Sequence, residues 1–291
     1  MTPSSIRKQE VRAAGSQKSR DKFLDVFLHH LKTCHIDTGE KLLVIGGAWR
    51  DVELLTSAGF KDITLSNFRS GFEENSNSDL DLKVKLLEID AERIDSLDAS
   101  FDFIFAHEVL HHCRSPHRAL CEMLRVARKH VVLLEPNDSL VMRALTRTGI
   151  SFPYEIFSVV GHGYEAGGVR DSCVPNFIYR WTASEVRKTV SSYLAEYLFM
   201  VHPYPYWDFN VDAEELCKRK ETKIQAITAV IKPETLLAGL RALQTVLNRI
   251  PILRRQGNKF FCCIENTQEL RPWLAAADGK IRFNSDFSPR A

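Results

Sequence analysis

The sequence predicts an α/β protein built on a mostly parallel, doubly wound sheet, and three observations support this fold class. Leu42–Ile45 is a short apolar strand, followed by a two-glycine turn and by a helix that ends before Gly59. Phe101–Ala106 is a continuous aromatic and β-branched strand, and Val131–Leu134 is a further apolar strand, with helical periodicity between the two. Strands that alternate with helices at this spacing are typical of βαβ units in a parallel sheet.

The other elements complete a sheet of seven strands. A first amphipathic helix is predicted from Phe23 to Leu31, where apolar residues recur at helical spacing. The capping pattern that begins at Thr182 predicts a helix to about Tyr193, and the segment 208–256 is mostly helical apart from breaks at its prolines. The further predicted elements are strands at 63–65, 83–89, 194–201 and 259–264 and helices at 52–58 and 115–128.

One domain is expected over residues 37–265. An N-terminal arm and helix over 1–36 would precede it, and a tail over 266–291 would follow it. Insertions at about 141–180 and 208–256 are expected to form a lid or cap. The first 22 residues carry six basic and two acidic side chains, a bias typical of a solvated arm.

Composition excludes several classes of partner. The formal net charge of +2 does not favour a nucleic acid or an anionic membrane, and no apolar run approaches the ~18 residues of a spanning helix. Seven cysteines without CxxC spacing fit a reducing compartment better than a disulfide scaffold. The N-terminus lacks the apolar stretch of a secretory signal. We therefore expect a cytoplasmic protein with neither a nucleic-acid nor a membrane partner.

Polar residues follow the ends of successive predicted strands. The first strand runs into the turn Gly46-Gly47-Ala48, and glycines in such a turn let the backbone pass close to a ligand. Asn67 lies 21 residues after Gly46 and follows the second strand, and Asp90 follows the third. The fourth strand ends in the run His107-Glu108-Val109-Leu110-His111-His112. Because the carboxyl ends of parallel strands share one edge, these residues predict a ligand site there.

With these residues, the stretch from 41 to 138 resembles the class I S-adenosylmethionine-dependent methyltransferases, in particular the group that acts on small molecules. The fourth strand, its turn and the following helix and strand carry most of the resemblance. The first turn departs from the family pattern D-x-G-x-G-x-G at Val44, Ala48 and Arg50. The resemblance implies a Rossmann-like fold with a seven-stranded sheet and S-adenosylmethionine as the cofactor.

The resemblance also implies which residues contact the cofactor. Asn67 stands where the family has an acidic residue for the ribose, and its amide can donate to and accept from hydroxyls. Asp90 stands where an acidic residue accepts from the adenine amino group. The alternative roles are an ordinary turn residue for Asn67 and a helix N-cap for Asp90. The predicted cofactor-binding set is Gly46, Gly47, Ala48, Asn67, Phe68, Asp90, Ala91, His107 and Glu108.

His111 and His112 are the predicted catalytic residues, because they lie just beyond the strand edge where the methyl group should sit. Histidine suits a general base near neutral pH, although a helix-start or core-packing histidine is the alternative. Two aromatic-rich segments could line an apolar acceptor pocket or a cation–π cage. They could equally form a satellite core or a homodimer contact. The substrate residues predicted from them are Tyr179, Trp181, Tyr204, Tyr206 and Trp207.

Three rival activities fit the sequence less well. His107-Glu108-x-x-His111 matches a zinc-protease motif, but that motif needs both histidines on one helix, whereas His107 continues a strand. We therefore expect no metal site. A dinucleotide-binding motif would need two glycines that this turn lacks. The turn after the fourth strand also lacks the N/D-P-P-Y/F/W pattern typical of enzymes that methylate nucleic-acid bases.

The sequence thus predicts transfer of a methyl group from S-adenosylmethionine to an oxygen or nitrogen atom of a small-molecule acceptor. The altered glycine turn motivates one alternative, a catalytically inactive methyltransferase-like binding or partner protein.

Overall fold

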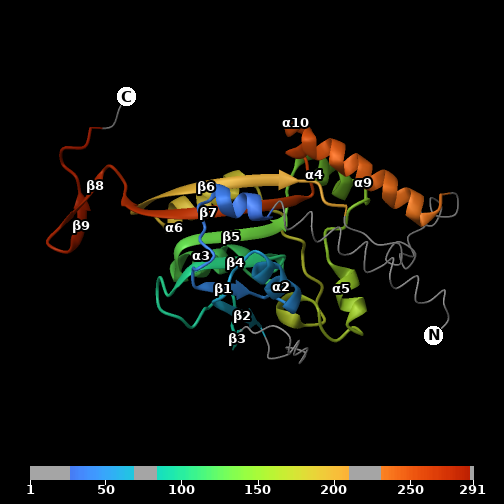
Figure 1. Cartoon of the computed structure of the whole chain (residues 1–291), viewed down its shortest axis with the longest axis horizontal. Helices are drawn as coiled ribbons and strands as arrows, with labels where there is room; N and C mark the ends of the chain where they lie inside the picture. The colour runs from blue at the N-terminus through green and yellow to red at the C-terminus, as the bar shows by residue number, and fades with distance from the viewer. Residues whose placement is uncertain (1–26, 69–83, 210–230, 289–291) are drawn as a thin grey trace.

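Figure 1 shows the computed structural model of the chain, which describes residues 27–68, 84–209 and 231–288. The basic arm over residues 1–22 and part of the 208–256 insertion lie outside the described residues. Residues 27–33 are helical, in agreement with the predicted first helix. Across the three described ranges, no helix has both the length and the apolar character needed to cross a membrane.

The main sheet has seven strands in the order β3-β2-β1-β4-β5-β7-β6. All strand pairs are parallel except those of β7, which runs antiparallel to both β5 and β6. The predicted mostly parallel, doubly wound sheet is therefore confirmed. The strands are β1 (Leu42–Ile45), β2 (Ile63–Asn67), β3 (Lys85–Glu88), β4 (Phe101–His107), β5 (Ala127–Pro136), β6 (Tyr197–Tyr206) and β7 (Lys259–Leu270).

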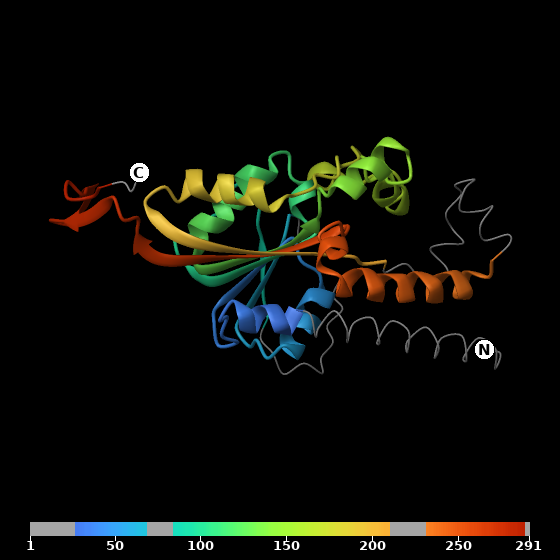
Figure 2. The same cartoon turned by 90° about the horizontal axis from the view of Figure 1, so that it is seen from above.

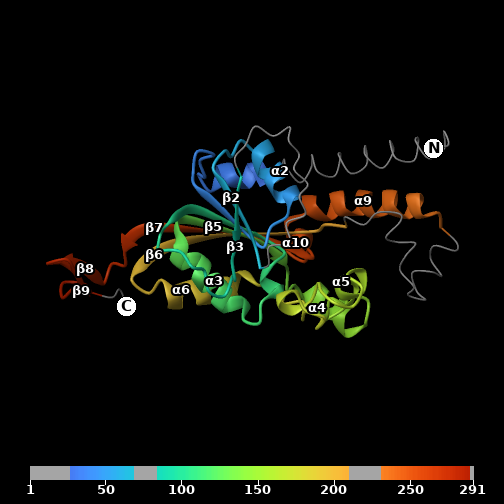
Figure 3. The same ribbon diagram turned by 90° about the horizontal axis from the view of Figure 1, so that it is seen from below.

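Helices cover both faces of this sheet, and alternating side chains of each strand enter two separate cores. Leu42 and Val44 of β1 pack against the 27–33 helix and α2 (Trp49–Ser57), whereas Leu43 and Ile45 belong to the core beneath α3 (Pro116–Val126) and α6 (Ala183–Tyr193). Figures 2 and 3 show these two helix layers on opposite sides of the sheet. Burial on both faces explains why the parallel strands are continuous apolar runs.

The strand order reverses between β1, which pairs with β2, and β4, which follows β3 in the chain. In open α/β sheets, ligands bind at the carboxyl ends of the strands near such a point. The segment between β5 and α6 lies at this end of the sheet, on the side of α3 (Figure 3). Its helices are α4 (Leu140–Arg147), α5 (Ile156–Gly161) and the 3-10 turn η2 (Val169–Asp171).

The C-terminal part differs from the prediction in two places. β7 continues to Leu270, and a hairpin of β8 (Leu274–Ala277) and β9 (Lys280–Phe283) follows where a tail is predicted. Between β6 and β7, the helices α9 (Pro233–Arg249) and α10 (Pro251–Arg254) confirm the helical character of the second insertion. Their starting prolines occupy the first turn, where no N–H is required.

β6 is longer than predicted and includes Tyr204 and Tyr206, two of the predicted substrate residues. Pro203 and Pro205 interrupt this stretch of the sequence and indicate a loop. In the structure β6 is the edge strand and pairs only with β7. A proline lacks the N–H group that a central strand needs, but an edge strand tolerates it. Tyr204 and Tyr206 therefore belong to an edge strand rather than to a loop.

Candidate active site

The turn after β1 has the backbone geometry that its glycines allow. Gly46 has a φ of +60°, in the left-handed region, and a Cβ atom built there would lie 2.1 Å from Cγ2 of Val109. A Cβ atom on Gly47 would lie 2.4 Å from Cγ1 of Val44. Ala48 is the N-cap residue of α2. The turn therefore keeps the two glycines that its geometry requires, and the third position tolerates a methyl group.

Asp51 links this turn to the end of β4, a role that the sequence analysis does not predict. Its Oδ2 accepts the N–H of Ala48 at 2.8 Å, and its Oδ1 lies 2.8 Å from Nδ1 of His107. Burial acts to raise the pKa of Asp51, but His107 and the Ala48 N–H outweigh it and hold that pKa below its usual value. His107, a predicted cofactor residue, is thus fixed against the glycine turn.

Asn67 and Phe68 follow β2 at the same edge. The Oδ1 atom of Asn67 accepts the N–H of Phe68 at 2.7 Å, which is the contact of an ordinary turn residue. Its amide N–H groups make no hydrogen bond within the described residues and are available to a ligand hydroxyl. Asn67 can therefore act both as an ordinary turn residue and as a ligand for the ribose hydroxyls.

Asp90 carries a contact that the sequence could not predict. Its Oδ1 accepts the N–H of Glu92 at 3.0 Å, and its Oδ2 accepts from Nη2 of Arg170 at 2.7 Å. The Arg170 guanidinium also lies over the Phe68 ring, with 4.8 Å from Cζ to the ring centre. Arg170 of η2 therefore joins two predicted cofactor residues, while the neighbouring Ala91 is buried in the core.

The chain bends sharply after β4. Glu108 has a φ of 53°, its N–H donates to the carbonyl of Leu134 at 2.7 Å, and its side chain pairs with Lys259 of β7. His107 ends β4 and His111 belongs to the separate 3-10 turn η1 (Leu110–His112), so the two histidines do not share the helix that a zinc-protease motif requires.

Glu135 of β5 stabilises this bend by accepting hydrogen bonds from it. Its carboxylate is fully buried, and Oε1 accepts the N–H groups of Val109 at 2.9 Å and Leu110 at 2.8 Å. Its Oε2 lies 3.0 Å from Nδ1 of His111. The sequence analysis missed Glu135 as a site residue, although its position at the end of a buried strand is a usable signal.

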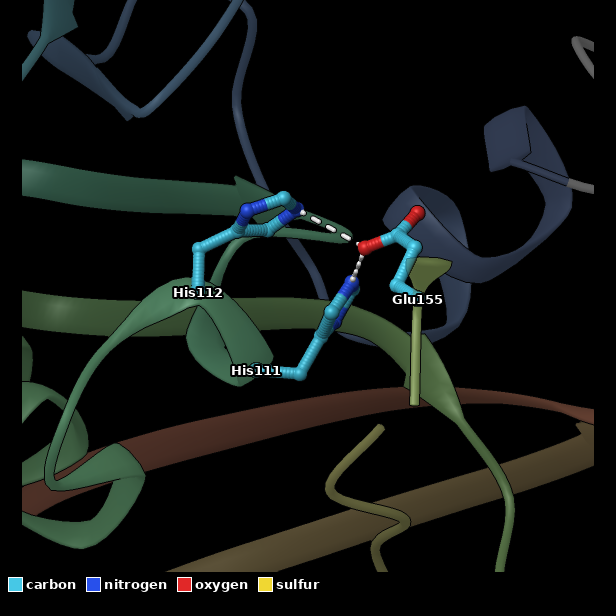
Figure 4. A group of neighbouring side chains, drawn as sticks. All are labelled: His111, His112 and Glu155. Atoms are coloured by element: carbon cyan, nitrogen blue, oxygen red, sulfur yellow. Dashed lines mark ion pairs between the residues drawn. The ribbon is translucent and has the colours of Figure 1, made fainter. Parts of the chain in front are cut away.

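His111 and His112 lie together with Glu155, which immediately precedes α5 (Figure 4). Oε2 of Glu155 is 3.5 Å from Nε2 of His111 and 3.4 Å from Nε2 of His112. Burial acts to lower the pKa of His111, but the carboxylates of Glu135 and Glu155 outweigh it and raise this pKa to about 9. Burial and the charge on His111 lower the pKa of His112. The two histidines therefore differ in basicity, and Nδ1 of His112 accepts from the side-chain amide of Asn176 at 2.6 Å.

The predicted substrate residues divide into three groups. Tyr179 lies near the histidines and lines a cavity with His111. Trp181 is fully buried in the core beneath α3 and α6. Tyr204, Tyr206 and Trp207 lie on or just after β6, where they pack against the 27–33 helix and the α9–α10 segment.

The cavity beside His111 has a volume of about 230 Å³. Cys113 and Pro116 line it from the β4 side, and Val169 and Phe177 line it from the segment between β5 and α6. Its walls are mainly apolar, with His111 as a polar group. Such a small, aromatic-lined space suits part of a small molecule better than an extended polymer.

Comparisons with known proteins agree with this geometry. A family model described as a methyltransferase domain matches residues 47–134. A chain of the Haloferax volcanii complex between the Trm112 methyltransferase activator and a methyltransferase is 12% identical, with 88% of this chain and 94% of that chain covered and a TM-score of 0.50. YcgJ from Bacillus subtilis is 16% identical, with 84% and 97% covered and a TM-score of 0.46. An S-adenosylmethionine-dependent methyltransferase from Thermotoga maritima is 12% identical, with 90% and 98% covered and a TM-score of 0.45. No curated protein sequence matches the chain.

The sheet order, the glycine turn and the family match together define an α/β enzyme that uses a nucleoside-containing methyl donor. The matched stretch, residues 47–134, is a methyltransferase domain, and the seven-stranded sheet that contains it has the Rossmann-like methyltransferase fold. S-adenosylmethionine is accordingly its cofactor, and it supplies an electrophilic methyl group when bound.

One observation tests whether the residues present fit this cofactor. The Arg170 guanidinium is a planar, nitrogen-rich group that stacks on Phe68 and donates to Asp90. Phe68 and Asp90 can therefore hold a planar N–H donor such as an adenine ring. The residues fit, provided that Arg170 leaves this position when the nucleoside binds.

Proposed function

We propose that the protein methylates an oxygen or nitrogen atom of a small-molecule acceptor. The observation that carries this proposal is the cavity of about 230 Å³ lined by His111, Phe177 and Tyr179. The cavity lies beyond the end of β4, beside the turn η1. This turn follows the edge of the sheet at which the cofactor site is predicted. Pockets for drug-sized ligands occupy roughly 300–1,000 Å³, so the part of the acceptor that enters this cavity is small.

The residues of the chain would mainly bind and align the two reactants and exclude water, because methyl transfer depends on an in-line approach. Gly46, Gly47, Asn67 and Asp90 would hold the cofactor. For a hydroxyl or ammonium acceptor, His112, whose pKa is lowered by burial and by His111, would take up the proton at Nε2 once the Asn176 side-chain amide has turned to accept from Nδ1. His111 would remain protonated and orient Glu155.

The remaining predictions on cellular setting belong to this proposal. The six described cysteines are free thiols, which supports the proposed reducing, cytoplasmic compartment. The proposed partners are the small-molecule acceptor and a second copy of the chain, with no nucleic acid and no membrane. Size-exclusion chromatography with light scattering tests the homodimer.

Cofactor binding is tested first, by calorimetric titration of the full-length protein with S-adenosylhomocysteine. We expect micromolar binding that is lost in Asp90→Ala and retained in Asp138→Ala, an acidic residue at the same sheet edge that pairs with Arg143 instead. A folded wild-type protein that binds neither S-adenosylmethionine nor S-adenosylhomocysteine would support the alternative of an inactive binding protein.

The acceptor class is tested by incubating the protein with S-adenosylmethionine and pools of small alcohols, phenols, carboxylic acids and amines. Release of S-adenosylhomocysteine is measured by mass spectrometry. We expect turnover with one pool and a raised KM for that acceptor in Phe177→Ala, because Phe177 lines the cavity. Turnover only with protein or RNA acceptors contradicts the small-molecule proposal.

A further inference from the structure

Two histidines and one carboxylate lie close together beside the acceptor cavity. A histidine that acts as a general base does not need this arrangement. One ring nitrogen of His111, one ring nitrogen of His112 and one carboxylate oxygen of Glu155 all lie within 4.8 Å of one another (Figure 4). The carboxylate oxygen is 3.5 Å and 3.4 Å from the two nitrogens. Hydrogen bonds between such charged groups are usually about 2.7–2.9 Å long, so these contacts are longer than a shared proton needs.

Two of the three separations, those from Oε2 of Glu155 to the histidine nitrogens, match the distance between ligands of one metal ion. Histidine nitrogen and carboxylate oxygen bind zinc at about 2.0–2.2 Å, and two ligands at that distance in a tetrahedron lie about 3.4 Å apart. An ion placed among the three atoms would therefore reach each of them at a normal bond length after small side-chain adjustments. The donor set of two nitrogens and one oxygen suits transition metals rather than magnesium or calcium.

Each histidine is also oriented through its other ring nitrogen. Nδ1 of His111 lies 3.0 Å from the buried carboxylate of Glu135 and donates its proton there, so a metal ion would displace only the proton on Nε2. Metal-binding histidines commonly have such a carboxylate partner, which fixes the ring and raises its basicity. Glu135 also accepts two backbone N–H groups of the turn that carries the histidines. The position of His111 is therefore set before any ligand arrives.

Asn176 provides the corresponding support for the other two side chains. Its side-chain amide lies 2.6 Å from Nδ1 of His112 and 3.3 Å from Oε2 of Glu155, and its carbonyl accepts the N–H of Glu155. Asn176 is fully buried, and its Oδ1 atom has no hydrogen-bond partner in the described structure. Half a turn of the amide would let Oδ1 accept from Nδ1–H of His112, which frees Nε2 of His112 for a metal.

We propose that His111, His112 and Glu155 bind a divalent transition-metal ion, such as Zn(II) or Fe(II), beside the acceptor cavity. Three protein ligands leave at least one coordination position open, as in catalytic rather than structural metal sites. Because His111 also lines the cavity, an acceptor oxygen there could occupy the open position. The metal would then lower the pKa of a bound hydroxyl group, and His112 would act as a ligand instead of a base. This role of the metal rests on the proposed function, whereas metal binding itself does not.

The test uses the full-length protein stripped of metal with a chelator and then titrated with Co(II) as a spectroscopic probe. We expect one equivalent of Co(II) to give visible d–d absorption that Zn(II) abolishes by displacement. Glu155→Gln and His112→Gln each remove a ligand with little change in volume, so each should weaken Co(II) binding by at least tenfold. Asn176→Ala should weaken it about 10- to 100-fold, the range for residues that orient ligands.

His117→Gln is the matched control. His117 is a half-buried histidine that contacts Tyr179 and Thr189 but lies outside the cluster, so this variant should bind Co(II) as the wild type does. Circular dichroism and S-adenosylhomocysteine titration of every variant show that fold and cofactor site are intact. They also separate failure of the metal proposal from failure of the proposed function. Absence of stoichiometric Co(II) uptake by the folded wild type, or uptake unchanged in both ligand variants, would overturn the proposal.

Discussion

Removing the Arg170 guanidinium should strengthen cofactor binding. Arg170 donates to Asp90 at 2.7 Å and lies over the Phe68 ring, and these are the contacts proposed for adenine. The guanidinium and the adenine ring cannot occupy the same place, so the free energy of the Arg170 contacts is lost whenever the cofactor binds. Arg170→Ala removes this competition and should lower the dissociation constant of S-adenosylhomocysteine.

The exposure of the ion pair sets the size of the effect. The side chains of Arg170 and Asp90 are 37% and 28% exposed, a setting in which an ion pair contributes about 0–1 kcal/mol. The cation–π contact with Phe68 adds about 0.5–1 kcal/mol. Since about 1.4 kcal/mol corresponds to a tenfold change, a total of about 0.5–2 kcal/mol predicts roughly 2- to 30-fold tighter binding.

Calorimetric titration with S-adenosylhomocysteine measures this change. Arg143→Ala is the control, because Arg143 forms a similar ion pair with Asp138, with side chains 48% and 28% exposed, away from the predicted cofactor residues. We expect its dissociation constant to equal that of the wild type. If Arg170→Ala binds no more tightly than the wild type, the assignment of adenine to the position between Phe68 and Asp90 is wrong.

Three further predictions follow from buried groups and backbone geometry. Gly46→Ala should cost about 1–3 kcal/mol of unfolding free energy because of its positive φ and its contact with Val109, and urea denaturation should show partial recovery when Val109→Ala is added. Glu135→Ala should cost about 3–5 kcal/mol in the same assay, since three buried N–H donors lose their acceptor; a loss below about 1 kcal/mol would contradict the assigned hydrogen bonds. Burial, with the nearby charges of His29 and Arg254, lowers the pKa of His30 to about 4, below the unfolded value of about 6.5. The resulting stability is present above pH 6.5 and is lost as the pH falls toward 4, by about 2 kcal/mol at pH 5, and His30→Phe should remove this part of the pH dependence of unfolding.

The sheet could be predicted from the sequence because its strands are buried on both faces. β1 and β4 are apolar at nearly every position, and glycines, charged residues and capping residues stand at their ends. Local sequence patterns therefore locate both the strands and the carboxyl edge. The same logic placed His107, His111 and His112 at that edge, since each follows β4 within a few residues.

The edge strand β6 shows where local patterns fail. Its second half reads as a proline-rich aromatic loop, because proline is excluded from central strands. Only the sheet order reveals that this strand has a single neighbour and can accommodate Pro203 and Pro205. The aromatic residues of this stretch therefore pack against the 27–33 helix and the α9–α10 segment, and the cavity is lined by residues 111–116 and by residues from the other insertion.

Glu155 and Arg170 could not be predicted as site residues, for a different physical reason. They lie between β5 and α6 in a stretch without hydrophobic periodicity. Glu155 is 43 residues from His112, and Arg170 is 80 residues from Asp90. Nothing in the local sequence distinguishes them from solvent-exposed charges. Tertiary structure alone brings them to the carboxyl edge, so the resemblance of 41–138 to the family contains no information about them.

Through Glu155 and Arg170, the segment between β5 and α6 contacts both the histidine cluster and the proposed adenine position. Glu155 contacts His111 and His112 beside the acceptor cavity, and Arg170 occupies the proposed adenine position. His112 and Glu155 are further tied to Asn176, six residues beyond Arg170. When the cofactor displaces Arg170, the chain around residue 170 must move, while Glu155 and Asn176 on either side of it keep their contacts with the histidines. Binding at one site should therefore change affinity at the other, and thermodynamic linkage requires the change to be equal in both directions.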